Sequence, residues 1–117
     1  RLLKLQVKGS QDGGWGLFQG HKSESVNYHE AIDAWGKSQV AEIVYVFVQF
    51  KSIAAGQLPR CYIARPSEVV LHMHTTRGGH GYTSMREAHT YSSGVGKGHT
   101  DRVPQAWLAT QQRIDTI

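Results

Sequence analysis

Apolar and polar side chains alternate along residues 2–8, at the start of the chain. The apolar positions are Leu3, Leu5 and Val7, and the polar positions between them are Lys4, Gln6 and Lys8. Alternate residues of a β-strand share a face, so the pattern predicts a strand with one apolar and one polar face. We expect this strand to be an interior member of a sheet.

The next segments predict three more strands. Residues 9–14 (GSQDGG) have turn chemistry, and residues 15–19 (WGLFQ) follow as a strand that we expect to form a hairpin with the first. Residues 41–50 (AEIVYVFVQF) are β-branched and aromatic on both faces, which is typical of a central, covered strand. After a loop, residues 60–64 (RCYIA) predict a further strand.

Helical periodicity separates these strands. Asn27 and Glu30 have the spacing of a capping box, which predicts a helix over 28–38. Its apolar stripe consists of Tyr28, Ala31, Ile32 and Trp35. Pro66 has the chemistry of a first helical position, and it predicts a short helix through His74.

The last third of the chain has a weaker pattern. We expect loops across residues 75–102, interrupted by a short helix from Ser84 to Tyr91, and a last helix over 104–115 that begins at Pro104. The element order predicts one α/β (α+β) domain over residues 1–117, with a mixed central sheet of about four to five strands and helices packed on its faces. The three tryptophans, which we expect to anchor the core, are Trp15, Trp35 and Trp107.

Composition adds a basic balance. The formal net charge is +4, the sequence pI is about 9.4, and seven histidines add charge in mild acid. This balance favours an anionic partner, with nucleic acid first, although many basic domains bind nothing anionic. The longest apolar run, 43–48, is too short to span a bilayer, and no signal-peptide pattern is present. Cys61 is the single cysteine, which fits a reducing, cytoplasmic setting.

Four stretches within residues 2–74 together resemble the PD-(D/E)XK nuclease-like superfamily, in particular its uncharacterised bacterial members. These stretches are LKLQVKGS, WGLFQ, IVYVFVQF and CYIARPSEVVLHM. The resemblance implies a restriction-endonuclease-like half-fold. In that family two acidic groups hold a divalent metal such as Mg²⁺, which polarises a phosphate and activates water. A lysine on the same strand face orients the water or stabilises the developing charge.

By this resemblance Gln6 stands at the position of the second acid and Lys8 at the position of the catalytic lysine. The family's first acid lies on an upstream strand, whereas the first acidic residue here is Asp12, in the predicted turn. The chain begins with Arg1 rather than Met, and the family's leading helix and first acid have no counterpart. We therefore interpret it either as the latter part of a nuclease-like domain or as an N-terminally reduced relative, and in both cases the metal site is incomplete alone. A carboxylate from an upstream segment or a second subunit would complete the site. The alternative is that Gln6 and Lys8 are simply the polar side of an amphipathic strand.

Basic residues elsewhere suit contact with a nucleic-acid backbone. Besides Lys4, the candidates are Arg77, Arg86 and Lys97. Arg77 and Arg86 lie in a stretch with interleaved His and Tyr residues, which equally suits an exposed loop. The segment GVGKGHT around Lys97 departs from a phosphate-binding P-loop, because Gly98 rather than Ser or Thr follows the lysine.

Two other candidates have plainer interpretations. On a strand His72 and His74 would share a face and could bind a metal, but on the predicted helix they point about 200° apart. Without a nearby acidic partner, we interpret them as surface histidines. Cys61 lies in the middle of a strand, where a lone cysteine is most often buried and inert.

Three functions follow from this sequence. The first is a nuclease-like domain that is inactive alone and contacts DNA, and a mobile-element or defence setting is associated with such relatives. The second is a Mg²⁺-dependent nuclease completed by an upstream segment or a second subunit. The third is a dimeric interaction module without a nucleic-acid role. An uncovered sheet edge would favour a homodimer in each case.

Overall fold

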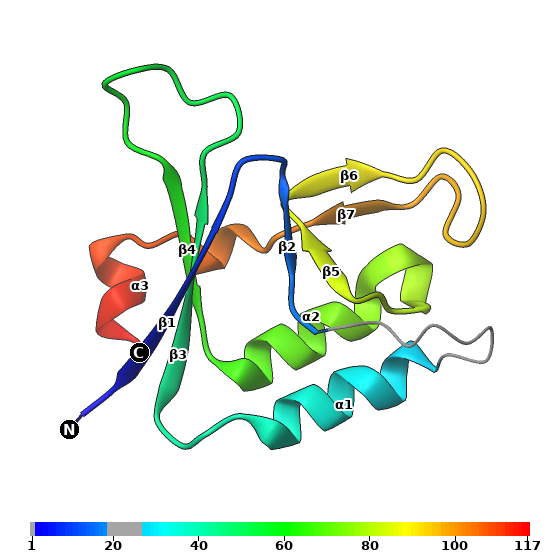
Figure 1. Cartoon of the computed structure of the whole chain (residues 1–117), viewed down its shortest axis with the longest axis horizontal. Coiled ribbons are helices and arrows are strands. Elements are labelled where there is room, and N and C mark those ends of the chain that lie inside the picture. Colours follow the sequence, from blue (N-terminus) through cyan, green and yellow to red (C-terminus); the bar gives the residue numbers. More distant parts are fainter. Residues whose placement is uncertain (1, 19–26) are drawn as a thin grey trace.

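Three strands form the main sheet of the computed structural model, which describes residues 2–18 and 27–117. They are β1 (Lys4–Ser10), β3 (Ile43–Gln49) and β4 (Arg60–Ala64), in the order β1-β3-β4. β1 is parallel to β3, and β4 is antiparallel to it (Figure 1). The mixed sheet with helices confirms the predicted α/β (α+β) class, but the main sheet has three strands among the described residues instead of the expected four to five, because the other strands pair in two small separate sheets.

Helix α1 (Tyr28–Ser38) lies in the crossover that two parallel neighbouring strands require. The Oδ1 atom of Asn27 accepts a hydrogen bond from the backbone N–H of Glu30 at 3.2 Å, so the predicted cap is present. The helix has the predicted bounds, and the burial of Ile32 and Trp35 confirms its predicted apolar stripe.

Helix α2 (Pro66–Gly79) begins at the predicted proline but extends beyond the predicted end at His74. It is kinked near its end, where Thr76 is extended and Arg77 and Gly78 have positive φ values of 51° and 69°. A left-handed arginine is unfavourable, so contacts elsewhere must hold it.

The expected hairpin between the opening strand and residues 15–19 is wrong. β2 (Gly14–Gly16) pairs with β5 (Ser84–Arg86) in an antiparallel two-stranded sheet, while β1 pairs with β3. The turn after β1 therefore carries the chain out of the main sheet instead of back along it (Figure 1).

The expected helix over residues 84–91 is also wrong, because this segment forms β5 and then β6 (Ala88–Thr90). β6 pairs with β7 (Thr100–Arg102) in a second small antiparallel sheet. The predicted last helix is divided into the 3₁₀ helix η1 (Gln105–Trp107) and the short helix α3 (Gln111–Asp115).

The core lies on one face of the main sheet. The register places Tyr45, Phe47, Tyr62 and Ala64 on this face, and all four are buried. They belong to one apolar cluster with Ile32 and Trp35 of α1 and with Val69 and Met73 of α2. Trp15, Trp35 and Trp107 are all buried in this cluster, which confirms their predicted role as core anchors.

β1 is an edge strand of the described sheet, so the expectation that it is an interior strand is wrong. Leu5 and Val7 point to the opposite face from the core, and they are 62% and 59% exposed. The apolar side of this strand is therefore uncovered among the residues that the structure describes. The opposite edge of the sheet, at β4, is covered by the C-terminal segment, since Ala109 N–H donates to the Cys61 carbonyl.

Candidate functional site

A polar cleft lies where β1 ends and the chain turns into β2. Its volume is about 300 Å³, and it is lined by Lys8, Gly9, Ser10, Asp12, Gly14, Trp15 and Gly16. β1 and β3 are parallel and end together, since Ser10 is paired with Gln49. The cleft is thus outside the carboxyl ends of two parallel strands, a usual location for ligand sites in α/β proteins.

The turn that forms the cleft is organised by Asp12. Its Oδ1 atom accepts a hydrogen bond from the Ser10 hydroxyl at 2.9 Å and another from the Gly14 N–H at 3.1 Å. The hydrogen bond from Ser10 and the backbone donor of Gly14 both lower the pKa of Asp12. The carboxylate is therefore ionised at neutral pH and already accepts two hydrogen bonds from its own turn.

Gln49, at the end of β3, holds the turn in place through hydrogen bonds to its backbone. Its side chain is fully buried, and its Oε1 atom accepts hydrogen bonds from the backbone N–H groups of Gly13, at 3.2 Å, and Lys51, at 3.1 Å. Its Nε2 atom has no hydrogen-bond partner among the described residues. Trp15 adds a hydrogen bond from its Nε1 to the Val48 carbonyl at 3.2 Å, which fixes the far wall of the cleft to β3.

Three cationic side chains approach this turn. Lys8 is half-buried, and its Nζ atom lies 3.4 Å from the carbonyl oxygen of Gly16. The Nζ atom of Lys51 lies 3.5 Å from where a Cβ atom on Gly13 would be, and the Cδ atom of Arg86 lies 3.0 Å from the same position on Gly14. Arg86 also contributes to the lowered pKa of Asp12 through its charge. Positive charge thus exceeds negative charge around the cleft.

Glu87 is beside the turn, but its carboxylate is already paired with Arg60. Its carboxylate accepts hydrogen bonds from Arg60 Nε at 2.7 Å, Arg60 Nη2 at 2.8 Å and the Tyr62 hydroxyl at 2.6 Å. The hydrogen bonds from Arg60 lower the pKa of Glu87 against the opposing effect of burial. Burial first, and then the neighbouring carboxylate, raise the pKa of Tyr62 to about 12.

The described residues do not by themselves fit the Mg²⁺ that the resemblance implies. Magnesium prefers several oxygen ligands in near-octahedral geometry. Asp12 is the one carboxylate that lines the described cleft, and Gln6 is exposed and absent from its lining. In the part of the chain that the structure describes, no three His, Cys, Asp or Glu side chains are placed to hold a metal ion.

The structure separates the other predicted nucleic-acid residues. Lys4 is exposed at the start of β1, and Lys97 is exposed in the loop between β6 and β7. The guanidinium of Arg77 lies over the rings of Tyr28 and Tyr82, at 4.9 Å and 4.6 Å from their centroids. Of the predicted set, only Lys8 and Arg86 are placed at the cleft.

Asp101 holds the left-handed Arg77 in place. It is 3% exposed, and its carboxylate accepts hydrogen bonds from the Arg77 N–H at 3.0 Å and the Tyr91 hydroxyl at 2.7 Å, with His99 Nε2 at 3.2 Å. Burial and then the hydrogen bond to Asp101 raise the pKa of Tyr91. This network joins the kink of α2 to the β6–β7 hairpin and has a structural role.

The interpretation of His72 and His74 as surface histidines without an acidic partner is wrong for both, since His74 has an acidic partner and the Nε2 atom of His72 is buried. His74 is hydrogen-bonded to Asp33 of α1, an acidic residue far away in sequence. His72 instead packs edge-on against Trp107, and burial lowers the pKa of its imidazole. Cys61 is half-buried in β4.

Sequence reasoning misses Gln49 and Lys51. Both come at or just after the end of the strongly apolar 43–48 segment, and a parallel pairing with β1 would have predicted their place beside the turn. No protein-family model matches this chain, and no curated protein or solved structure matches it. None of the helices in the described part of the chain is long and apolar enough to cross a lipid bilayer.

Proposed function

We propose that this domain binds the phosphate backbone of DNA at the cleft beside the turn 10–14. The observation that carries the proposal is the approach of Lys8, Lys51 and Arg86 to one turn whose single lining carboxylate is Asp12. Lysine and arginine side chains supply most of the affinity for a polyanion, because they release condensed counterions. The basic net charge of the whole chain acts in the same direction.

Binding of a short labelled DNA duplex, measured by fluorescence anisotropy across a salt series, tests this proposal. Removal of one phosphate-binding side chain should lower the slope of log K against log salt by about 1. We expect Lys8→Ala, Lys51→Ala and Arg86→Ala each to weaken binding in this way. Lys37→Ala on α1 removes the same charge away from the cleft and is the matched control. Absence of binding at low salt, or an equal loss with the control, would refute the proposal.

A second candidate is assembly with a second copy of the chain along β1. Lys4 N–H donates to the Glu42 carbonyl, and the Ser10 carbonyl accepts from Phe50 N–H, so these residues direct their backbone groups toward β3. The alternating residues Leu5 and Val7 therefore direct theirs to the open edge. Antiparallel pairing centred on Leu5 would place Leu3 opposite Val7 and Lys4 opposite Gln6, so that no lysine faces a lysine.

Such an assembly is compatible with a dimeric module and with a nuclease completed by the partner's carboxylates. Light scattering distinguishes it from a monomer, and we expect Leu5→Pro to reduce dimer formation while Leu58→Pro in the exposed 51–59 loop does not. DNA cleavage that needs Mg²⁺ or Mn²⁺ and is abolished by Lys8→Ala would favour the nuclease. A tight dimer with neither cleavage nor DNA binding would favour the module.

A further inference from the structure

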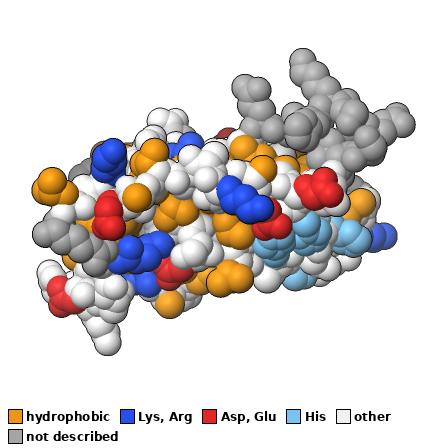
Figure 2. Space-filling view, turned by 90° about the horizontal axis from the view of Figure 1, so that it is seen from below, with side chains coloured by type: hydrophobic (Ala, Val, Ile, Leu, Met, Phe, Trp, Pro, Cys, Tyr) orange, Lys and Arg blue, Asp and Glu red, His pale blue; other side chains and the backbone are white. Residues whose placement is uncertain are grey.

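Two histidines join α1 to α2 at one end of the helical layer. The helices lie side by side (Figure 1), and histidine side chains gather at one end of their outer face (Figure 2). His29 is in the first turn of α1, His74 is on α2, and Asp33 follows His29 by one turn on α1. This cluster belongs to neither the polar cleft nor the core.

The hydrogen bonds of the two rings form a chain. His29 Nε2 lies 2.7 Å from the carbonyl oxygen of Gly79, and His74 Nε2 lies 2.7 Å from Asp33 Oδ1. The Nδ1 atoms of the two rings are hydrogen-bonded to each other. The ring planes are parallel within 5° and the centroids are 4.7 Å apart, so the rings meet edge to edge through these two nitrogens.

The number of protons needed along this series of hydrogen bonds determines the charge of the histidine pair. A backbone carbonyl and an ionised carboxylate only accept hydrogen bonds, so each Nε2 must carry a proton. The contact between the two Nδ1 atoms requires one more proton, because two lone pairs facing each other repel. Three protons are thus needed, whereas two neutral imidazoles hold two. With all three contacts made as hydrogen bonds, the pair would carry one positive charge beside the carboxylate of Asp33.

We propose that His29 and His74 share one bound proton and form a cationic clamp that fastens the first turn of α1 to the end of α2. The clamp holds while the proton is bound and opens when it is lost. Asp33 is the charged side chain that is hydrogen-bonded to the pair. The other charged or titratable residues of the two helices are Tyr28, Glu30 and Lys37 on α1 and Glu68, His72 and Arg77 on α2, with His80 directly after α2.

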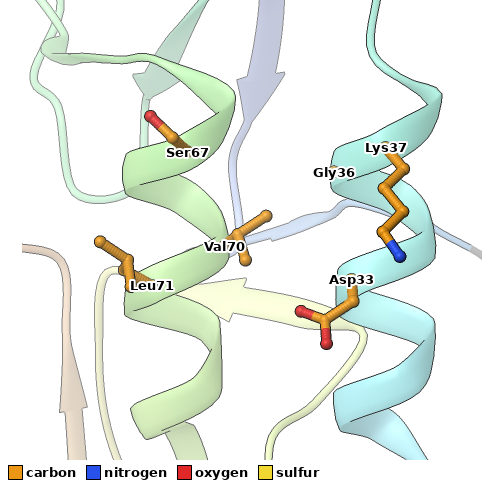
Figure 3. A pocket seen from close by; sticks show the side chains of 6 residues that line it. All are labelled: Asp33, Gly36, Lys37, Ser67, Val70 and Leu71. Atoms are coloured by element: carbon orange, nitrogen blue, oxygen red, sulfur yellow. The ribbon is translucent and has the colours of Figure 1, made fainter.

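The clamp lies beside a groove between the two helices. The groove has a volume of about 550 Å³, and its lining includes Asp33, Lys37, Val70 and Leu71 (Figure 3). At Gly36 the helices are in close contact, since a Cβ atom there would lie 2.7 Å from Val70 Cγ2. Loss of the shared proton would therefore free the Asp33 end of the groove while the Gly36 contact persists.

Nuclear magnetic resonance of the ¹⁵N-labelled chain tests the shared proton directly. In the folded chain we expect both Nε2 atoms to be protonated. We also expect a scalar coupling between the two Nδ1 nitrogens across their hydrogen bond. Two neutral rings with no coupling would overturn the proposal. A second result would also overturn it. If the sample treated with EDTA shows no coupling, and its ring signals shift when one equivalent of Zn²⁺ is added, the cation between the rings is a metal and not a proton.

A stability measurement gives an independent readout. The folded pair binds a proton that separate neutral imidazoles in the unfolded chain do not. The folded state therefore gains stability relative to the unfolded state as pH falls and loses stability as pH rises. One linked proton lowers the folding equilibrium constant by at most about tenfold per pH unit as pH rises, and this fall should be smaller in His29→Asn. His80→Asn removes an exposed histidine near the same helix end and should retain the wild-type slope. Equal slopes for the wild type and His29→Asn would contradict the clamp.

Discussion

The guanidinium of Arg60 meets the carboxylate of Glu87 through two hydrogen bonds, 2.7 Å from Nε and 2.8 Å from Nη2. This pair joins β4 to the residue between β5 and β6. The backbone of Glu87 adds two more links, since its N–H donates to the Gly13 carbonyl and its carbonyl accepts from Val103 N–H. Glu87 therefore couples the turn at the cleft to the main sheet and to the last third of the chain.

Replacement of Glu87 by Gln should destabilise the fold by about 1–2 kcal/mol, because the charge-assisted hydrogen bonds to Arg60 are removed. Full burial would give a larger effect, but the side chain of Arg60 is 37% exposed and solvent screens the pair. Urea unfolding measures the difference. Glu30→Gln on the exposed face of α1 is the control, and a similar loss there would contradict a special role for the pair.

The stabilisation from Glu87 should depend on pH in a definite direction. The pKa of Glu87 is lowered in the folded state, mainly by Arg60, so its contribution is complete above the ordinary value near 4.5 and is lost as pH falls through the folded value. The difference in unfolding free energy between the wild type and Glu87→Gln should therefore shrink in acid. A difference that stays constant between about pH 6 and about pH 3 would show that the carboxylate charge contributes nothing.

Tyr62 should act at the opposite end of the pH scale. Its pKa is raised to about 12 by burial and by Glu87, so its contribution is present below the ordinary value of 10.0 and is lost as pH rises toward the folded value. Burial also raises the pKa of Tyr45 and Tyr91, so absorbance of the phenolate should reveal several late-titrating groups, and Tyr62→Phe should remove one of them. An unchanged number of late-titrating phenols in Tyr62→Phe would contradict the assignment.

Gly13 should resist substitution. Its φ is +88°, a region that other residues rarely adopt, and a Cβ atom there would approach the side chain of Lys51 at 3.2 Å. We expect Gly13→Ala to destabilise the fold by about 1 kcal/mol and to weaken DNA binding. Gly16→Ala is the matched control for stability, because nothing lies within 4 Å of its Cβ position. Gly56→Ala, at a φ of +84° outside the cleft lining, is the control for DNA binding. A neutral effect at Gly13 would indicate that the turn is not held in this conformation.

Gln49 should be required for the same turn. Gln49→Leu keeps a side chain of similar size but leaves the N–H groups of Gly13 and Lys51 without their acceptor, at a cost of about 1–3 kcal/mol. Thermal unfolding and DNA binding are the measurements. The same change at the exposed Gln57 should have little effect on either. If Gln49→Leu binds DNA with wild-type salt dependence, the geometry of the turn does not control binding.

Local signals in the sequence predict the elements with strong caps and strong apolar patterns. Asn27 and Glu30 define α1 because the cap is formed within four residues, and the apolar run around Phe47 defines β3. The pairing of the strands cannot be predicted from such local signals. A short turn after β1 suggests a hairpin, but the parallel pairing of β1 with β3 depends on the whole intervening crossover.

Contacts between residues far apart in the sequence explain the remaining differences between the predicted and the observed structure. Ser84 and Glu87 have helix-cap spacing, but Arg60 and Tyr62 take the Glu87 carboxylate and the segment becomes two strands. The sequence presents His74 as a surface residue because its partner Asp33 is 41 residues away. At the candidate site, Lys8 and Arg86 can be found from sequence, whereas Gln49 and Lys51 need the register of the sheet.

Arg113 has a consequence for how many copies of this chain can join. Its Nη2 atom donates to the carbonyl of Ile63 at 2.9 Å and to the carboxylate of Glu68, so the C-terminal segment is fastened along the outer side of β4. If copies pair along β1 as proposed, a protomer whose β4 edge is covered and whose β1 edge is uncovered among the described residues forms a closed pair and adds no third copy. A chain cut before Leu108 would lose the Ala109 hydrogen bond as well as Arg113, so both edges of the sheet would be exposed and self-association would become open-ended, as in a fibre.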